Sequence, residues 1–472
     1  MATAEDREQG DGLSHKLKPR HVSMIAIGGI IGAGLFVGSS TSIAQVGPAV
    51  ILSYALAGLL ILMVMRMLSE MACQHPGAGS FTELVRLGLG DRVGFVCGWL
   101  YWYFWVVVVA IEGIAGAVIL AQWLPLPVWV IGMILLALMT GVNLLSTRSY
   151  GEFEFWFSLL KVAAIIAFIL LAGGWAFGLT SPGGATFSNL VTYGGFAPRG
   201  PLAVLAGVTS VIFALCGAEI ATIAAAESDD PEKAVARIGA SVATRILLFY
   251  LLSITLIVSV VPWTDIEPGV SPFVAALDRM AIPHAGGIMN LVVLVAVLSC
   301  LNSGLYVTSR VLFVLSERGH APRGLVQLSR RRVPVRSILI GSLFAYMALA
   351  ASVLSPQLVF SFLVNASGAI MLIVYLLVCL AQIRSRRALG ELAARQLPVR
   401  MWLFPLASYA SATGIAVVMA SMVFEPAMRA ELVASLVLLA VVCVFAFLKD
   451  GRGLAAEVDA LSLSERTIEK AR

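Results

Sequence analysis

The sequence predicts an all-α polytopic membrane protein with about twelve transmembrane helices, and three observations support this class. Of the 472 residues, 59% are hydrophobic and only 12% are charged, whereas soluble domains carry about 25% charged residues. The mean hydropathy of the chain is +0.93. Apolar segments close to or longer than the ~20 residues that cross a bilayer core recur along the chain, at 22–42, 48–66, 93–120, 124–145, 155–178, 203–226, 242–262, 286–315, 337–355, 358–382, 402–423 and 431–448.

The distribution of positive charge predicts that both termini are cytoplasmic. With the N-terminus inside, only Arg199, Arg279 and Arg429 of the 32 Lys and Arg residues fall on the outer side, in agreement with the positive-inside rule. The polar, acidic start of the chain lacks the basic-then-apolar order of a cleaved signal peptide, so the first span is expected to be an uncleaved anchor. We expect cytoplasmic tails at 1–21 and 449–472, and the basic residues set the orientation of the protein and form no nucleic-acid site.

Enzyme and metal chemistry have no support in the sequence. The chain lacks the H-E-x-x-H and G-x-S-x-G motifs, and its five histidines lie outside the predicted spans. Its six cysteines show no C-x-x-C spacing, which argues against a thiolate metal site and against a disulfide framework. We therefore expect no cofactor, no metal and no catalytic residue.

The first span carries a dense run of glycines within Ile25–Ser40, namely Gly28, Gly29, Gly32, Gly34 and Gly38. Each glycine costs a helix roughly 1 kcal/mol relative to alanine. One interpretation is a continuous helix whose glycines only allow close packing against a neighbour. The other is a helix unwound near its middle, whose bare N–H and C=O groups face a bound ligand. Non-helical backbone at this depth is tolerated only where it is buried in protein or lines a cavity.

A second interruption favours the unwound interpretation. Gly217 and Glu219 interrupt the sixth span, which opens a second set of five helices as the first span opens the first set. Interruptions at corresponding positions of two halves are typical of inverted-repeat transporters with a site between the halves. We expect two inverted five-helix repeats at 22–178 and 203–382, with broken helices 1 and 6. Two peripheral helices at 402–448 carry little polarity and are expected to be scaffold or subunit contacts.

Two ionisable side chains lie deep in predicted spans. Trp105 and Glu112 share one face of the third span. A mid-membrane carboxylate is costly and faces a cavity or a partner, so Glu112 either lines the solute path or pairs with another helix. Lys161, in the fifth span, is the only lysine inside any predicted span. It either snorkels to the inner surface or is a buried amine able to lose and regain a proton.

Two local patterns complete the prediction from the residues alone. Polar residues recur at three- and four-residue spacing in the eighth span, a stripe that serves inter-helix hydrogen bonds or lines the path: Ser299, Asn302, Ser303, Tyr306 and Ser309. Before the third span, Ser80 and Glu83 have the spacing of a capping box, which predicts a short interfacial helix over Phe81–Leu89; an ordinary loop is the alternative.

Several stretches of the chain resemble a known family, in order as well as in residues. They include Gly34-Leu-Phe-Val-Gly-Ser-Ser40, Met65-Arg-Met-Leu-Ser-Glu-Met71, Gly98-Trp-Leu-Tyr-Trp102, Gly217-Ala-Glu-Ile-Ala-Thr-Ile-Ala-Ala-Ala-Glu-Ser228 and Cys300-Leu-Asn-Ser-Gly-Leu-Tyr306. Over roughly residues 15–450 the chain is similar to the amino acid–polyamine–organocation (APC) superfamily. Within it, the chain resembles the bacterial amino acid permeases, and most of all the γ-aminobutyrate (GABA) permeases.

The resemblance implies ten core helices in the two repeats and a site at the broken helices. It implies that the amides of Ala33 and Gly34 hold the substrate carboxylate. It also implies that backbone carbonyls hold the substrate amine, at Ile30, Phe213, Ala214 and Cys216. Helix N-termini favour anions and unwound carbonyls favour cations, so the physics agrees. Lys161 stands where sodium-coupled relatives hold an ion, which makes it the proton-coupling residue.

We therefore expect a secondary active transporter that imports a small amino acid or ω-amino acid, with γ-aminobutyrate first, by proton symport with alternating access. Its partners are the amino acid, the proton and the lipid bilayer; the oligomeric state is left open. Glu112 is expected to bind substrate, and Trp105, Glu219 and Asn302 to line the path. The alternatives are a permease for another amino acid, an exchanger, and a sensor or channel on the same scaffold.

Overall fold

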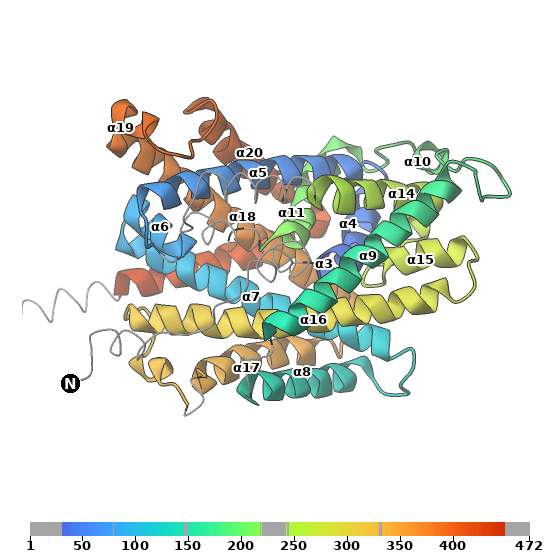
Figure 1. The fold of residues 1–472 in the computed structure, drawn as a ribbon, viewed down its shortest axis with the longest axis horizontal. Helices are drawn as coiled ribbons and strands as arrows, with labels where there is room; N and C mark the ends of the chain where they lie inside the picture. The colour runs from blue at the N-terminus through green and yellow to red at the C-terminus, as the bar shows by residue number, and fades with distance from the viewer. Residues whose placement is uncertain are drawn as a thin grey trace, which may run out of the picture.

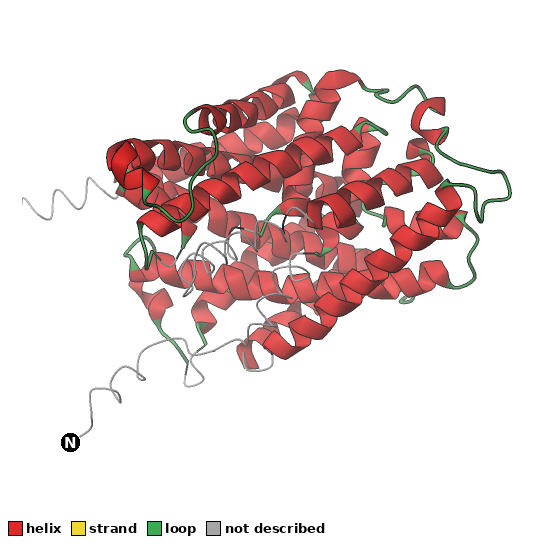
Figure 2. Cartoon of the chain, turned by 45° about the horizontal axis from the view of Figure 1, so that its top comes forward, coloured by secondary structure: helices red, strands yellow, loops and turns green. Residues whose placement is uncertain are grey.

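The computed structural model describes residues 31–78, 80–145, 150–217, 219, 242, 245–329 and 333–448, and these contain helices and loops but no strand (Figures 1 and 2). In chain order the helices are α3 (Ala33–Phe36), α4 (Gly38–Val46), α5 (Val50–Gln74), α6 (Phe81–Leu89), α7 (Asp91–Leu120), α8 (Val128–Leu145), α9 (Tyr150–Ala176), α10 (Asn189–Thr192), α11 (Gly200–Leu215), the π-helix η2 (Arg245–Leu252), α14 (Ser253–Val260), α15 (Pro272–Arg279), α16 (Ala285–Glu317), α17 (Val335–Ala351), α18 (Pro356–Leu389), α19 (Glu391–Arg395), α20 (Leu406–Phe424) and a last helix over 429–448.

The helices account for the predicted membrane spans. Seven are long and apolar enough to cross a bilayer, namely α5, α7, α9, α16, α18, α20 and Pro426–Leu448. Shorter apolar helices fall in four further predicted spans: α8, α11, η2 with α14, and α17. With α3 and α4 in the first span, each of the twelve predicted segments contains a helix among the described residues. The expected multi-pass membrane fold is therefore confirmed.

The long helices lie side by side along the long axis of the molecule (Figure 1). The short helices α6 and α19 lie at one end of this axis, and α10 lies at the opposite end with the loop before α15. α7 is the central helix, because it packs against α16, α18, α17, α8 and α6. A helix surrounded in this way is screened from lipid, so its polar side chains must find partners inside the protein.

The short helix before α7 has the predicted bounds and the predicted cap. α6 runs over Phe81–Leu89, and the Ser80 hydroxyl accepts a hydrogen bond from the Glu83 backbone N–H at 3.3 Å. The Glu83 carboxylate also binds Arg86 at 2.6 Å and Arg318 at 3.0 Å. The hydrogen bond from Arg86 lowers the pKa of the Glu83 carboxyl below its ordinary value. Glu83 therefore ties α6 to the end of α16.

A buried ion pair joins α5 to α18 near α6. The Glu70 side chain is fully buried and accepts hydrogen bonds from Arg386 at 2.9 Å and from the Gln382 amide at 2.8 Å. The backbone N–H of Met401 completes the set at 2.6 Å, which attaches the connection between α19 and α20. Three donors from two segments thus converge on one carboxylate.

Removing this carboxylate is expected to destabilise the fold. Glu70→Ala leaves the Arg386 guanidinium buried without its counter-charge, and losing one partner of a buried pair costs about 3–5 kcal/mol. Chemical unfolding of the purified protein in detergent measures the loss. Glu391→Ala is the matched control, because Glu391 and Arg395 form a 4.0 Å pair with side chains 95% and 73% exposed. Equal effects of the two substitutions would contradict the assigned role of Glu70.

Candidate functional site

Among the described residues, a helix begins at the first predicted interruption and another helix ends at the second, and we call these two points the breaks. In the first span, α3 begins at Ala33 after Gly32, whose φ and ψ of −138° and −144° are not helical. In the sixth span, α11 ends at Leu215, Cys216 is extended with φ −62° and ψ 160°, and Gly217 has φ +104°. A positive φ of this size is accessible to glycine at little cost, which explains why glycine stands at this break.

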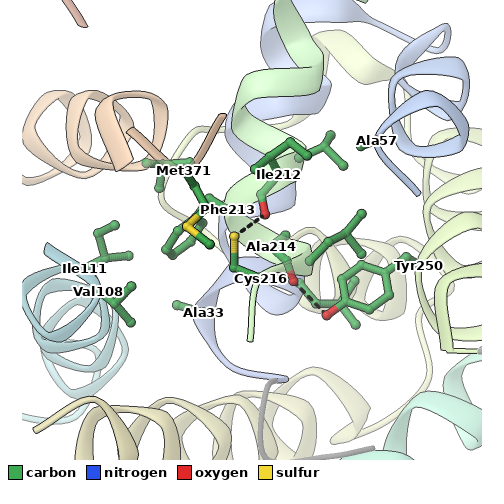
Figure 3. Packing of buried hydrophobic residues seen from close by; sticks show 14 of the residues in the cluster. Ala33, Ala57, Val108, Ile111, Ile212, Phe213, Ala214, Cys216, Tyr250 and Met371 are labelled. Carbon is green, nitrogen blue, oxygen red and sulfur yellow. Dashed lines mark hydrogen bonds between the residues drawn. The ribbon is translucent and has the colours of Figure 1, made fainter. Parts of the chain in front are cut away.

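The two breaks lie against each other. A Cβ added to Gly34 would lie 2.7 Å from the Cα of Ala214, so the missing side chain lets α3 approach the backbone of α11. In the view of Figure 3, Ala33 lies between Cys216 and Val108 of α7, with Phe213 above it. Close contact between the broken helices thus depends on Gly34.

A carboxylate lies on the first amide of α3. The Ala33 N–H donates to both oxygens of Glu112 at 3.0 Å, and the Glu112 side chain is 1% exposed. A Cβ on Gly32 would lie 2.6 Å from Glu112 Oε1 and 2.6 Å from the Cβ of Cys300. Glu112 therefore lies in a narrow space between the break in the first span and α16. It takes the position that the resemblance implies for a substrate carboxylate.

Cys300 is a member of this site that the sequence analysis did not assign. Its neighbour Ser299 accepts a hydrogen bond from the Lys161 ammonium at 2.9 Å. Lys161 itself is 0% exposed, so its side chain is buried within the protein and does not snorkel to a surface. One turn of α16 therefore contacts both ionisable groups, Lys161 through Ser299 and Glu112 beside Cys300. The family motif that begins at Cys300 could have identified this residue, but only the polar residues of the motif were assigned a role from the sequence.

The predicted carbonyl positions of α11 lie at the same place. Phe213, Ala214 and Cys216 are all buried. The Ala214 carbonyl accepts a hydrogen bond from the Tyr250 hydroxyl at 2.8 Å, and the Cys216 thiol donates to the Ile212 carbonyl at 3.1 Å (Figure 3). Ile30, the remaining predicted carbonyl position, lies outside the described residues.

Glu219 forms a second carboxylate centre at the break in the sixth span. Its carboxylate accepts hydrogen bonds from the Gly217 N–H at 2.9 Å and from the hydroxyls of Tyr101 at 3.2 Å and Tyr375 at 3.3 Å. Tyr101 belongs to α7 and Tyr375 to α18. The centre therefore fixes the unwound backbone to two neighbouring helices. Trp105 packs edge to face on Tyr101, with ring centroids 6.2 Å apart.

Asn302 lies apart from these centres. Its side-chain oxygen accepts a hydrogen bond from the Asn143 amide of α8 at 2.8 Å. This contact is the inter-helix role considered for the polar stripe of the eighth span. The structure thus brings Glu112 and Trp105 of α7 toward the breaks, together with Glu219 beyond the end of α11, while Asn302 faces α8.

Comparison with known proteins identifies the family. The model of the family "Amino acid permease" matches residues 21–451. The chain belongs to the amino acid permease family. It is 46% identical to a GABA permease of Bacillus subtilis, over 92% of the chain and 93% of that protein. It is 42% identical to a GABA permease of Escherichia coli, over 93% of the chain and 94% of that protein. It is also 36% identical to an aromatic amino acid transport protein of Corynebacterium glutamicum, over 94% of the chain and 98% of that protein.

Membership of this family agrees with the predicted class. Amino acid permeases are membrane proteins that transport amino acids, so family and fold together indicate a multi-pass transporter and not an enzyme. The two breaks, the buried Lys161 and the two carboxylate centres are therefore the candidate transport site of this permease.

The contact between the breaks can be tested with a pair of glycines. Gly34→Ala forces α3 away from the Ala214 backbone, and we expect amino acid uptake into proteoliposomes to fall by ~10-fold or more, because shifts of about 1 Å at a binding site can cost a factor of about 100. Gly38→Ala is the control, since its Cβ would meet no described atom closer than 3.4 Å. Normal uptake by Gly34→Ala would show that close approach of the two helices is dispensable.

Proposed function

We propose that this permease is a secondary active transporter that imports a small amino acid by proton symport, with γ-aminobutyrate as the first substrate to test. The observation that carries the proposal is the hydrogen bond from the Ala33 N–H to both oxygens of a carboxylate. An amide that already binds one carboxylate in a buried site is chemically suited to bind the carboxylate of a substrate. Two relatives that cover more than nine-tenths of the chain are named as GABA permeases.

The substrate carboxylate would bind the amides of Ala33 and Gly34. The amine would meet the carbonyl side of α11 at Phe213, Ala214 and Cys216, which lies opposite α3. A zwitterion or an ω-amino acid satisfies both poles at once. Once the substrate holds the Ala33 amide, the Glu112 carboxylate is released and can join these carbonyls in binding the distal amine of an ω-amino acid.

The coupling residue in this proposal is Lys161. Its amine is buried and donates to Ser299 at 2.9 Å, and ionisable residues inside membrane spans mark ion pathways and proton relays. One proton moving down a potential of 100 mV supplies about 2.3 kcal/mol. This free energy supports tens-fold accumulation before any pH gradient is added. Spans one, two, six and seven would rock as a bundle against the remaining helices.

The remaining predictions complete the proposal. The two repeats would extend over 22–178 and 203–382, with 402–448 outside them. Both termini would face the cytoplasm of a bacterial cell, with the protein in the inner membrane, as the positive-inside rule predicts. Because one relative at 36% identity is named for aromatic amino acids, these amino acids belong in the panel of substrates to be tested.

Carrier, exchanger and channel give different fluxes. A proton symporter accumulates labelled γ-aminobutyrate when a pH gradient is imposed on proteoliposomes, and unlabelled competitors identify the preferred amino acid. An exchanger requires preloaded substrate on the opposite side, and a channel does not saturate. Failure of γ-aminobutyrate and every tested amino acid to compete or accumulate would overturn the proposal.

Replacing the buried amine is expected to uncouple transport. Lys161→Met removes the group that gains and loses the proton, so concentrative uptake is lost, while counterflow exchange of substrate down its own gradient persists. Uptake driven by an imposed pH gradient, measured beside counterflow, separates the two. Glu391→Gln is the control, because its side chain is 95% exposed and lies outside the site, and we expect accumulation to continue. Accumulation at the wild-type level by Lys161→Met would refute the coupling role.

Neutralising Glu112 is expected to weaken binding of substrates with a distal amine. A hydrogen bond to a charged group contributes about 1.5–3 kcal/mol, so Glu112→Gln should raise the KM for γ-aminobutyrate by ~10-fold or more. An α-amino acid of similar size should be affected less. Initial-rate uptake gives both constants, with the exposed Glu391→Gln as control. An unchanged KM for γ-aminobutyrate would assign Glu112 to structure alone.

A further inference from the structure

The last helix, over 429–448, contains a buried carboxylate that the transport site does not use. The sequence analysis assigned this helix to scaffold, yet Glu431 is only 7% exposed. Its Oε2 atom has no hydrogen-bond partner, and its Oε1 atom is 3.4 Å from the side-chain nitrogen of Asn365 on α18. A charged carboxylate held by one long hydrogen bond is poorly compensated for its burial.

The contact continues through a chain of side chains to both broken helices. Asn365 Oδ1 lies 2.5 Å from the Ser210 hydroxyl of α11, and that hydroxyl lies 3.1 Å from Oε1 of Gln45 at the end of α4. The chain Glu431–Asn365–Ser210–Gln45 thus starts on a peripheral helix, crosses α18 and ends on the outer halves of the first and sixth spans.

The number of available protons limits which groups in this chain donate and which accept. Ser210 has one hydroxyl proton, so it cannot donate to Asn365 and Gln45 at the same time. One of the two amides must present its nitrogen to Ser210, and an amide can be turned by a half rotation without moving its heavy-atom positions. Two consistent arrangements follow.

The two arrangements differ by one proton on Glu431. If Gln45 donates to Ser210, then Ser210 donates to Asn365, and Asn365 donates to a Glu431 carboxylate. If Asn365 donates to Ser210, then Ser210 donates to Gln45, and the Asn365 oxygen faces Glu431, which must then donate as a carboxylic acid. Binding a proton at Glu431 therefore permits the second arrangement, in which every hydrogen bond of the chain runs in the opposite direction, whereas a carboxylate permits only the first.

The surroundings of Glu431 offer no competing charge among the described residues. α18 contributes Asn365, and α11 contributes Ser210. The apolar cluster that contains Leu432 surrounds the adjoining turn with side chains of α11, α18, α20 and the turn before the helix, namely Ala206, Ala369, Met419, Met422 and Met428. Arg429, two residues earlier, donates to the Val423 carbonyl instead.

We propose that Glu431 is a second proton-binding site, separate from Lys161, and that its proton sets the direction of the Asn365–Ser210–Gln45 chain. The chain joins α18 to the outer halves of the two broken helices. Reversal of its hydrogen bonds therefore changes how these halves are bound to α18. The transport consequence rests on the proposed function, whereas the protonation of Glu431 does not.

Infrared difference spectra of the purified permease in lipid test the proton site directly. Between acidic and alkaline buffer, a protonated buried carboxyl gives a carbonyl stretch that a carboxylate does not. We expect Glu431→Gln to lose one such band and Ser210→Ala to keep it at a shifted frequency. A spectrum of Glu431→Gln identical to that of the wild type would overturn the proposal. If Glu431→Gln does not fold, an unshifted band in Ser210→Ala overturns it instead.

Transport at different external pH tests the consequence. We expect uptake by the wild type to fall as the external pH rises. Glu431→Gln should lose the part of this decline that comes from deprotonation of Glu431, because its amide donates a hydrogen bond as the protonated acid does. Ser210→Ala should lose it as well, because it interrupts the chain without touching Glu431. Glu425→Gln, on the loop before the same helix, is the control and should behave as the wild type.

The outcomes separate the two proposals. A wild-type pH profile in both Glu431→Gln and Ser210→Ala would overturn the link to transport. If the wild type transports no amino acid, the proposed function fails, and the infrared band still decides whether Glu431 holds a proton.

Discussion

Everything in this site follows from the need to satisfy backbone amides that the helix breaks expose where water is excluded. The break in the first span frees the Ala33 N–H, which is bound by Glu112, and the break in the sixth span frees the Gly217 N–H, which is bound by Glu219. At each break, one exposed amide thus binds a buried carboxylate. The acids that satisfy the amides at the breaks are the same groups that a charged substrate would meet in the proposed site.

This pairing changes what substrate binding means in energetic terms. A substrate carboxylate that takes the Ala33 amide gains that hydrogen bond only by displacing the one to Glu112, so affinity depends on where Glu112 goes next. Ser299 and Cys300 are adjacent on α16, one bound to Lys161 and the other beside Glu112. In the proposed mechanism, displacement of the acid and protonation of the amine would therefore act on the same turn of one helix, which is a short physical route for coupling.

The sequence predicted interruptions in the first and sixth spans, the capped helix α6 and an enclosed position for Glu112, because glycine density, cap spacing and the cost of charge in a membrane are local properties. It left open whether Lys161 is buried or reaches the surface. It did not predict partners. Glu219 is bound by Tyr101 and Tyr375, which are 118 and 156 residues away along the chain. Helical periodicity identifies which face of a helix is polar but not which helix that face meets. Glu431 was missed for the same reason, since one acid at the start of an apolar span resembles an interfacial residue until Asn365 is placed beside it.

The polar contacts of α18 suggest how the helices can move while the protein stays folded. Near α6 it holds α5 through Glu70 and Arg386, in the middle it reaches the sixth-span break through Tyr375 and Glu219, and further along it contacts α11 through Asn365 and Ser210. α18 is thus a common partner for helices of the proposed moving bundle at three levels. A typical hydrogen bond contributes about 1 kcal/mol net, so exchanging a few of them is a small cost beside the burial of the apolar core. Alternating access then requires that contacts at one level loosen while those at another persist, which a set of separate polar contacts permits and a continuous apolar interface does not.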